Sequence, residues 1–297
     1  MEIERGNEMS EQPKMIYSKC RICGDESEHK AYQVREMFFG TKEEFVYFEC
    51  DKCQCIQIME IPENLGEYYG REYYSFGEIK LQEPKTSERI EKRILDVGCG
   101  SGKWLVEKYA EGYVNLLGCD PFLEHDISYG QYIHIKKCTI HEMEGQFEVI
   151  RLHDSFEHMS DPLEVLVSIE RLLDRAGMCL LSIPVFPNAA YDIFGTYWYQ
   201  WDAPRHLFLH SVKSMEYLCS QAGLRIEEII FNSGDMQFLS SLLYQRGIPY
   251  IEQNDAVIER EFSTQEVAEF RKVTTELNQK GYGDHAVFVL IKDKSQF

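Results

Sequence analysis

The chain has 297 residues, enough for one large core and a smaller module, and its hydrophobic content of 44% is that of a globular protein. Its 31 basic and 50 acidic side chains give a formal net charge of −19 at pH 7. This charge disfavours nucleic acid as a partner, because phosphates are bound through Lys and Arg. No stretch approaches the roughly 18 apolar residues that cross a bilayer, so we also expect no membrane partner.

We expect residues 1–15, which are polar and acidic, to form a disordered tail. No secretion signal is recognisable in this sequence. The ten cysteines then indicate a reducing, cytoplasmic location, in which thiols serve as metal ligands or as small buried hydrophobes.

Two Cys-x-x-Cys pairs mark an N-terminal module, which we place at residues 16–62. The pairs, 26 residues apart, are Cys20 with Cys23 and Cys50 with Cys53. Each pair presents two thiolates from one tight turn, and two such turns complete a tetrahedral zinc site. The module resembles a zinc ribbon with a structural Zn²⁺ held by the four cysteines. Cys55 competes for the fourth position and His29 does so more weakly, while chance pairing and redox use are the alternatives.

Residues 63–92 follow as a linker between this module and a second domain at residues 93–297. From Glu78 to Arg93 the chain is polar and charged. We expect this stretch to contain the first helix, which would cap the second domain, and the domain boundary.

The second domain opens with the sequence Ile-Leu-Asp-Val-Gly-Cys-Gly-Ser-Gly at residues 94–102. This pattern predicts a buried strand, an acidic residue and three glycines at alternate positions before a helix from about Lys103 to Glu111. Glycine lets the backbone approach a ligand closely, and the helix directs its N-terminal amides to the same place. The sequence therefore predicts a cradle for a nucleotide-type cofactor at the carboxyl edge of a parallel sheet.

The residues around the glycines narrow the choice of cofactor. The dinucleotide fingerprint requires Gly or Ala where Lys103 stands, and the Gly-Lys-Ser/Thr ending of a phosphate loop is absent. Asp96 favours a cationic ligand over a pyrophosphate. Asp120 ends a short apolar strand 22 residues after Gly98, where a carboxylate can accept hydrogen bonds from both ribose hydroxyls. An ordinary aspartate at a strand end is the alternative for Asp120.

Further motifs follow in a characteristic order. Residues 147–158 form a fourth strand ending in a Glu-His pair, a helix of apolar period runs to Leu173, and residues 178–184 form a fifth buried strand. Together with Asp96 to Gly102, these motifs resemble the class I S-adenosylmethionine (SAM) methyltransferases. The resemblance implies an α/β fold with a Rossmann-like, doubly wound sheet of seven strands, the last of them antiparallel.

The resemblance also implies SAM as the cofactor and a set of residues around it. A Tyr-rich segment at residues 68–76 precedes the glycine loop, and in this family such segments fold over the cofactor, where aromatic rings can shield a sulfonium. An interdomain packing patch is the alternative for this segment. The residues expected to contact SAM are Asp96, Gly98, Cys99, Gly100, Gly102, Asp120, Pro121, Thr139, His153, Asp154 and Tyr74.

Two segments interrupt the minimal fold, at residues 186–210 and 233–284, and we expect them to cap the acceptor site. A dimer face is the alternative for residues 233–284. The first is a long aromatic connection that ends in the family-like sequence Pro-Arg-His-Leu. Methyl transfer needs alignment of donor and acceptor, and a base when the acceptor is a hydroxyl or an ammonium. His206 is the first candidate for this base, with Asp202 orienting it or binding a substrate hydroxyl. A hydrogen bond that anchors the loop is the alternative role for His206.

These observations predict a SAM-dependent methyltransferase acting on a small acceptor. A carbohydrate or a cell-surface or secondary-metabolite precursor is preferred by analogy with relatives of this layout. The first alternative is an rRNA base methyltransferase with a zinc-binding module, which the negative charge disfavours. The second is an inactive zinc-ribbon binding protein, against which the intact glycine loop argues.

Overall fold

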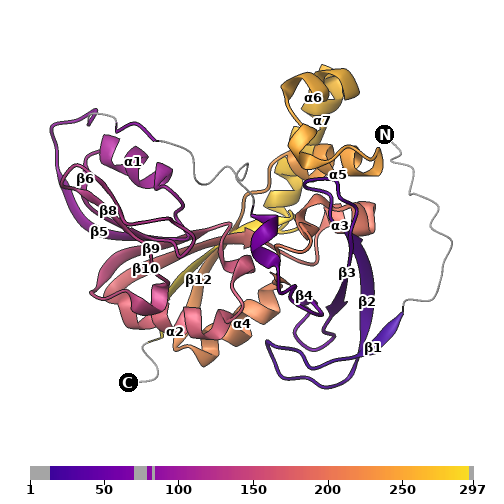
Figure 1. The fold of residues 1–297 in the computed structure, drawn as a ribbon, viewed down its shortest axis with the longest axis horizontal. Helices are drawn as coiled ribbons and strands as arrows, with labels where there is room; N and C mark the ends of the chain where they lie inside the picture. Colours follow the sequence, from indigo (N-terminus) through magenta and orange to yellow (C-terminus); the bar gives the residue numbers. More distant parts are fainter. Residues whose placement is uncertain (1–13, 70–78, 82–83, 294–297) are drawn as a thin grey trace. The chain divides into compact units, whose positions relative to one another are not determined.

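The computed structural model describes residues 14–69, 79–81 and 84–293, which fall into two compact units (Figure 1). The first unit is assembled from Met1–Tyr68, Pro184–Tyr217 and Ile230–Ala286. The second consists of Tyr69–Ile183, Leu218–Ile229 and Val287–Phe297. Among the described helices, none has the length and apolar character needed to span a membrane.

The second unit is built on an eight-stranded sheet with the order β12-β13-β10-β9-β5-β6-β8-β7. The strands are β5 (Ile90–Val97), β6 (Tyr113–Cys119), β7 (Ile127–Tyr129), β8 (Ile133–Lys136), β9 (Phe147–His153), β10 (Leu173–Pro184), β12 (Leu224–Phe231) and β13 (His285–Lys292). Strands β8, β6, β5, β9 and β10 run parallel to one another. The expected α/β, Rossmann-like class with a parallel centre is confirmed.

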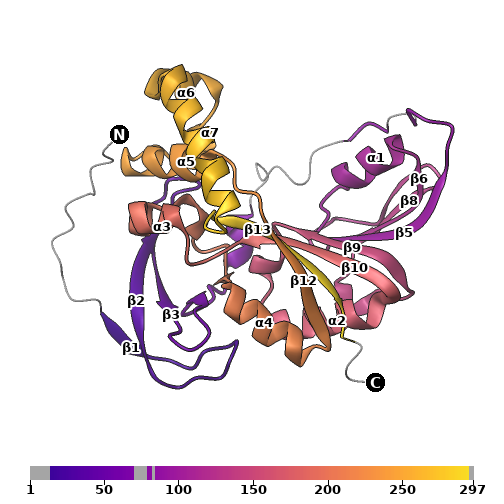
Figure 2. The same ribbon diagram turned by 180° about the vertical axis from the view of Figure 1, so that it is seen from behind.

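Helices cover both faces of this sheet, as doubly wound folds require. Helix α1 (Lys103–Ala110) follows β5 and α2 (Pro162–Leu172) follows β9, and Figures 1 and 2 show them on opposite sides of the strands. Helix α1 packs Leu105 and Val106 against Leu116 of β6. A third helix, α4 (Val212–Gln221), precedes β12.

The sheet has eight strands instead of the expected seven because a short hairpin extends its edge. Strand β7 pairs antiparallel with β8, and Gly130 reverses the chain between them with a φ of 62°. Ile127 and Tyr129 alternate along β7 and pack against the same core as β8. This alternation over three residues is too short to be recognised as a strand from sequence.

The helix expected between Glu78 and Arg93 is not found in the described part of that stretch. Residues 79–81 and 84–89 contain no helix, and β5 begins at Ile90. The described residues include Pro84, which lacks a backbone N–H, and they show no apolar stripe of helical period.

The first unit contains a five-stranded antiparallel sheet that draws on distant parts of the chain (Figure 2). Its order is β1 (Met15–Tyr17), β2 (Glu28–Arg35), β3 (Glu44–Glu49), β4 (Ile56–Ile58) and β11 (Phe208–Leu209). The last strand comes from segment 186–210, which we expected to be an insertion in the second domain. The same unit holds α3 (Ala189–Phe194), α5 (Met236–Gln245), α6 (Asp255–Glu261) and α7 (Thr264–Gln279).

Gly102 joins the glycine loop to helix α1 in a conformation that other residues seldom adopt. Its φ is 87°, and a Cβ atom there would lie 2.2 Å from Cδ1 of Ile135. The position therefore combines backbone strain with a steric clash in the core.

We predict that Gly102→Ala lowers the free energy of unfolding by about 1–3 kcal/mol more than Gly130→Ala. Gly130 has a φ of 62°, but a Cβ there would meet Cδ2 of Leu81 only at 3.8 Å, so this control isolates the backbone strain. Chemical denaturation of the two variants measures the difference, and equal losses would contradict a clash at Gly102.

Candidate functional site

A cavity of about 260 Å³ lies in the second unit, at the carboxyl ends of its parallel strands. Val97 and Gly98 reach it from β5, Cys119 and Asp120 from β6, and Asp154 from the end of β9. The remaining lining residues are Tyr69, Pro121, Phe122, Cys138, Thr139, Ile140, His141, Ser155, His158, Met159, Ser160, Asp161 and Val165. The cavity thus occupies the edge at which the sequence predicted a cofactor cradle.

The backbone of Gly98 lies at the wall of this cavity, at a position where any side chain would clash with its surroundings. Its φ is 69°, and a Cβ atom would lie 2.6 Å from Cβ of Ser155. Ser155 is held in place by donating a hydrogen bond to the carbonyl of Val97 at 3.1 Å. The turn that follows strand β5 and the segment that follows β9 therefore pack together as one wall of the cavity.

The carboxylate of Asp120 is fixed by two backbone N–H groups. Gly100 donates to Oδ2 and Phe122 donates to Oδ1, each at 2.9 Å. Burial raises the pKa of Asp120, and the hydrogen bonds from Phe122 and Gly100 oppose this rise. A carboxylate has about four acceptor positions, so two remain for hydroxyl groups of a ligand in the cavity.

Asp96 has a different environment and does not line the cavity. It is 2% exposed and forms an ion pair with Arg151 of β9, with 2.9 Å between Oδ1 and Nη1. The two residues are direct neighbours in the parallel register of β5 and β9, and the Arg151 guanidinium lies 4.5 Å from the ring centre of Trp104. The Asp96 carboxylate is therefore paired with the Arg151 guanidinium and not with a ligand in the cavity.

The other residues expected to contact a cofactor divide into three groups. Pro121, Thr139 and Asp154 line the cavity together with Gly98 and Asp120. Cys99, Gly100, Gly102 and His153 are outside its lining, although Gly100 acts through its hydrogen bond to Asp120. Tyr74 lies outside the described residues.

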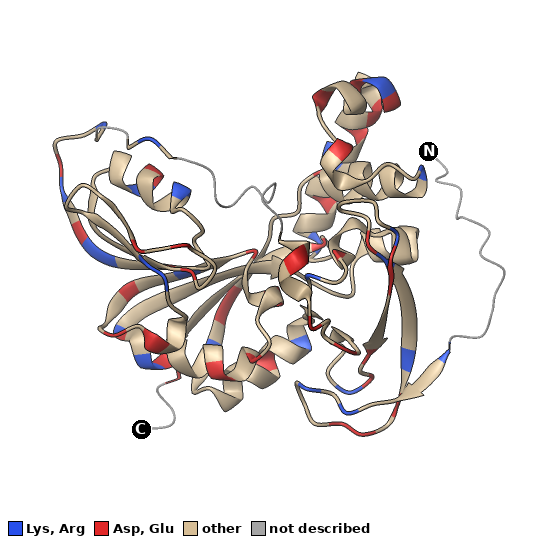
Figure 3. Ribbon diagram, viewed as in Figure 1, with Lys and Arg blue, Asp and Glu red and all other residues tan. Residues whose placement is uncertain are grey.

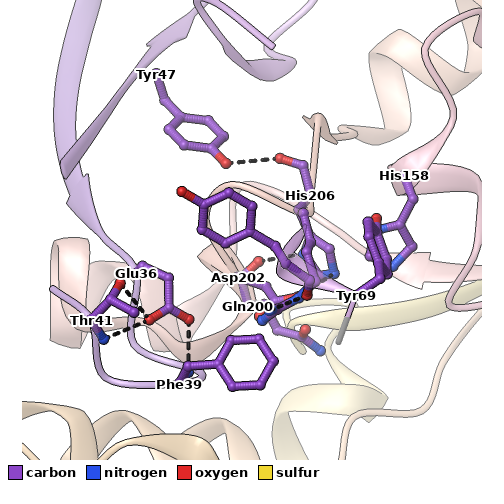
Figure 4. Close-up of polar contacts among 11 residues, drawn as sticks. Glu36, Phe39, Thr41, Tyr47, Tyr69, His158, Gln200, Asp202 and His206 are labelled. Carbon is purple, nitrogen blue, oxygen red and sulfur yellow. Dashed lines mark hydrogen bonds and ion pairs between the residues drawn. The ribbon is translucent and has the colours of Figure 1, made fainter. Parts of the chain in front are cut away.

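Three aromatic side chains at the cavity are not among the individual residues expected to contact SAM, although Tyr69 belongs to the Tyr-rich segment and His158 to the Glu-His pair noted in the sequence. The Tyr69 ring stacks on Phe122, with ring centres 5.6 Å apart, and its hydroxyl is 3.1 Å from Nδ1 of His158 (Figure 4). All three line the cavity, and Phe122 is 65% exposed. The Tyr-rich pattern that begins at Tyr68 was the available signal, and Tyr69 is its described member at this site.

The four cysteines of the two Cys-x-x-Cys pairs converge in the first unit. The Sγ atoms of Cys20 and Cys53 are 3.6 Å apart, those of Cys23 and Cys50 are 3.5 Å apart, and all four lie within 4.8 Å of one another. Tetrahedral Zn²⁺ with Zn–S bonds of about 2.3 Å requires sulfur separations of roughly 3.8 Å, so the cluster fits this ion.

The two alternative ligands named from the sequence lie beside this cluster. Cys55 is fully buried, with its Sγ 3.9 Å from Nδ1 of His210. His29 is also fully buried, stacks on Phe48 and lies within 4.8 Å of Cys50 and Asp25. The complete set of four neighbouring sulfurs favours the cysteine pairs as the ligands.

The structure places Asp202 and His206 together in the first unit (Figure 4). Nδ1 of His206 lies 2.8 Å from the carbonyl oxygen of Gln200, so this nitrogen carries a proton and donates. Nε2 is 3.7 Å from Oδ2 of Asp202, and Asp202 in turn accepts hydrogen bonds from Nε and Nη2 of the buried Arg205. In the neutral ring, Nε2 is therefore the nitrogen with the lone pair.

Two of the aromatic residues in segment 186–210 belong to the core of the first unit. Trp198 is fully buried and donates its indole N–H to Asp284 at 3.0 Å, while Trp201 is 2% exposed and packs edge-on against Tyr47. These two rings stabilise the first unit and offer no open face to a ligand.

Comparison with known proteins identifies the family of the second unit. Residues 70–229 match the family described as a methyltransferase domain. The chain belongs to this family. Its methyltransferase domain has the class I fold predicted from Asp96 to Gly102.

Individual relatives share the methyltransferase domain at low identity. The chain is 30% identical to the ubiquinone biosynthesis O-methyltransferase of Haemophilus ducreyi over 166 residues, which cover 49% of this chain and 70% of that protein. It is 22% identical to the tRNA U34 carboxymethyltransferase of Campylobacter jejuni over 178 residues, or 54% of this chain, and spans only 58% of that relative's length. Among solved structures, the cyclopropane synthase MmaA2 from Mycobacterium tuberculosis is similar with a TM-score of 0.42 and 16% identity, covering 69% of this chain and 80% of that one.

The buried Asp96–Arg151 pair predicts a pH effect on stability. Burial raises the pKa of Asp96 to about 6, although Arg151 lowers it. The folded protein therefore takes up a proton at Asp96 at a higher pH than the unfolded chain, and this uptake stabilises the fold as the pH falls from about 7 to 5.

An Asp96→Asn variant cannot take up this proton. We expect the melting temperature of the wild type, relative to that of Asp96→Asn, to rise between pH 7 and pH 5. Asp174→Asn, at a half-buried acid paired with Arg93, serves as the control whose difference from the wild type stays constant. A constant difference for Asp96→Asn as well would refute the raised pKa.

Proposed function

We propose that this protein transfers a methyl group from SAM to a small-molecule acceptor, with a carbohydrate or a related metabolite precursor as the preferred class. The observation that carries the proposal is the cavity at the strand edge, where Gly98 removes a side chain and Asp120 presents an oriented carboxylate. Family membership supports SAM as the donor.

The residues of the cavity suit the parts of an adenosyl ligand. Asp120 would accept hydrogen bonds from the ribose hydroxyls, and the backbone at Gly98 would allow close approach of the ligand chain. Tyr69 and Phe122 offer aromatic surface for the adenine ring or for a sulfonium cation. When bound, SAM would supply an electrophilic methyl group on a cationic sulfur, and the chain's own task would be to align it with the acceptor.

We further propose His206 as the base that removes the acceptor proton. The Gln200 carbonyl accepts a hydrogen bond from Nδ1, so in the neutral ring Nε2 carries the lone pair that would take up the acceptor proton. Asp202 lies 3.7 Å from Nε2 and would stabilise the resulting imidazolium.

The four cysteines would hold a structural Zn²⁺. All four coordination positions would be occupied by thiolates, which leaves no open position for a reacting group. We also propose a cytoplasmic location, because its reducing environment keeps thiols available as metal ligands.

The charge distribution favours a small acceptor over RNA. On the described ribbon, Lys and Arg are interspersed with more numerous Asp and Glu (Figure 3). With a net charge of −19, the chain lacks the electrostatic attraction that RNA binding uses. Retention on heparin or tRNA at low salt would revive RNA as the acceptor, and failure to bind either SAM or its demethylated product would indicate an inactive scaffold.

The role of Asp120 leads to a prediction for cofactor affinity. Asp120→Asn removes charge-assisted hydrogen bonds to the ribose, which contribute about 1.5–3 kcal/mol, so affinity for S-adenosylhomocysteine should fall by roughly 10- to 100-fold. Isothermal titration calorimetry measures this change. Asp174→Asn, outside the cavity lining, is the control, and equal affinities for both variants would exclude ribose binding by Asp120.

The role of His206 leads to a separate prediction for turnover. His206→Ala should lower kcat by about 10²- to 10⁴-fold while the affinity for S-adenosylhomocysteine stays within twofold. Turnover is measured as S-adenosylhomocysteine release with a panel of nucleotide-activated sugars and small hydroxylated acceptors. His134→Ala, on strand β8 and outside the cavity lining, is the matched control. Unchanged turnover in His206→Ala would leave His206 as a loop anchor.

A further inference from the structure

We propose that the four-cysteine cluster braces the loop that carries Asp202 and His206, and that Gln57 is the positioning residue that connects them. The inference rests on the proposed function because that function makes His206 the base. It assigns the N-terminal ribbon a part in methyl transfer, in addition to holding a structural ion.

Gln57 is a fully buried polar side chain between the cluster and strand β11. Its Nε2 donates to Sγ of Cys20 at 3.1 Å, and its Oε1 accepts from N of Arg21 at 2.9 Å. Its backbone pairs with Phe208 in the antiparallel ladder of β4 and β11. Gln57 therefore contacts Cys20 of the cluster through its side chain and Phe208, which follows closely after His206, through its main chain.

Three further hydrogen bonds tie the loop to the ribbon. Ser211 donates its hydroxyl to the carbonyl of Cys53 at 2.6 Å. The N–H of Ile58 donates to the carbonyl of Leu207 at 3.0 Å, and the Tyr47 hydroxyl donates to the carbonyl of His206 at 2.9 Å (Figure 4). The backbone from His206 to Ser211 is thus held by residues of the ribbon.

The ribbon can stabilise this loop only when the metal is bound, because strand β11 is too short to be stable alone. It has two residues, and its partner β4 has three; isolated pairs of this size are marginal in water. Cys-x-x-Cys turns gain much of their folding free energy from the bound ion. Without the ion, Cys20 and Cys53 are no longer fixed relative to each other, and Gln57 loses a stable thiolate acceptor in a buried place.

The test compares the zinc-loaded full chain with the same chain after zinc removal by a chelator, using hydrogen exchange followed by mass spectrometry. We expect amides of residues 203–209 to exchange at least tenfold faster without zinc, while residues 94–100 keep their protection. The affinity for S-adenosylhomocysteine should change less than twofold. Unchanged exchange at 203–209, or a purified chain that binds no metal, would overturn the proposal.

Helix α7 distinguishes a local brace from general unfolding of the first unit. If its residues 264–279 lose protection to the same extent as 203–209, the effect is one of overall stability and the brace is refuted. If the chain fails to bind S-adenosylhomocysteine yet residues 203–209 respond to zinc, the proposed function fails while the brace stands.

A variant that keeps all four cysteines provides the second line of evidence. Gln57→Leu should retain one zinc per chain, speed exchange at 203–209 by at least tenfold and lower kcat with little change in cofactor affinity. Gln33→Leu, on strand β2 of the same sheet, removes an exposed hydrogen bond to Glu44 and should change none of these readouts. Wild-type exchange in Gln57→Leu would exclude Gln57 as the link.

Discussion

The proposed cofactor site depends on two hydrogen bonds, which the backbone N–H groups of Gly100 and Phe122 donate to the Asp120 carboxylate. They join the turn after β5 to the end of β6, so two neighbouring strands present their carboxyl ends as one rigid edge. The same bonds orient the carboxylate, which lines the cavity. A buried acid held in this way costs little further ordering when a ligand binds.

Asp96 and Asp120 are similar residues with different partners, because they occupy different positions in the sheet. Both follow apolar strand residues, and both are largely buried. Asp96 points to Arg151 across the β5–β9 register, whereas Asp120 points to backbone amides at the sheet edge. One carboxylate therefore balances a charge within the protein, and the other remains available to a ligand.

The first unit is a single structure made from three separated parts of the chain. The ribbon strands, the loop before β11 and helices α3, α5, α6 and α7 share it. The loop that carries Asp202 and His206 is consequently held by a small sheet, and we attribute the stability of that sheet to a metal ion bound by the four cysteines. In our proposal, this arrangement would couple the geometry of the proposed base to a structural ion held by the four cysteines.

The amino-acid sequence by itself determined the methyltransferase class, the glycine loop, Asp120 and the two cysteine pairs. These features are local, since strand periodicity, positive-φ glycines and Cys-x-x-Cys turns are encoded within a few residues. Only the tertiary structure decided that Asp96 pairs with Arg151, that Trp198 and Trp201 are buried, and that β11 joins the ribbon. Those contacts depend on strand register and on partners more than 50 residues away, as in the 55-residue separation of Asp96 and Arg151, which no local pattern specifies.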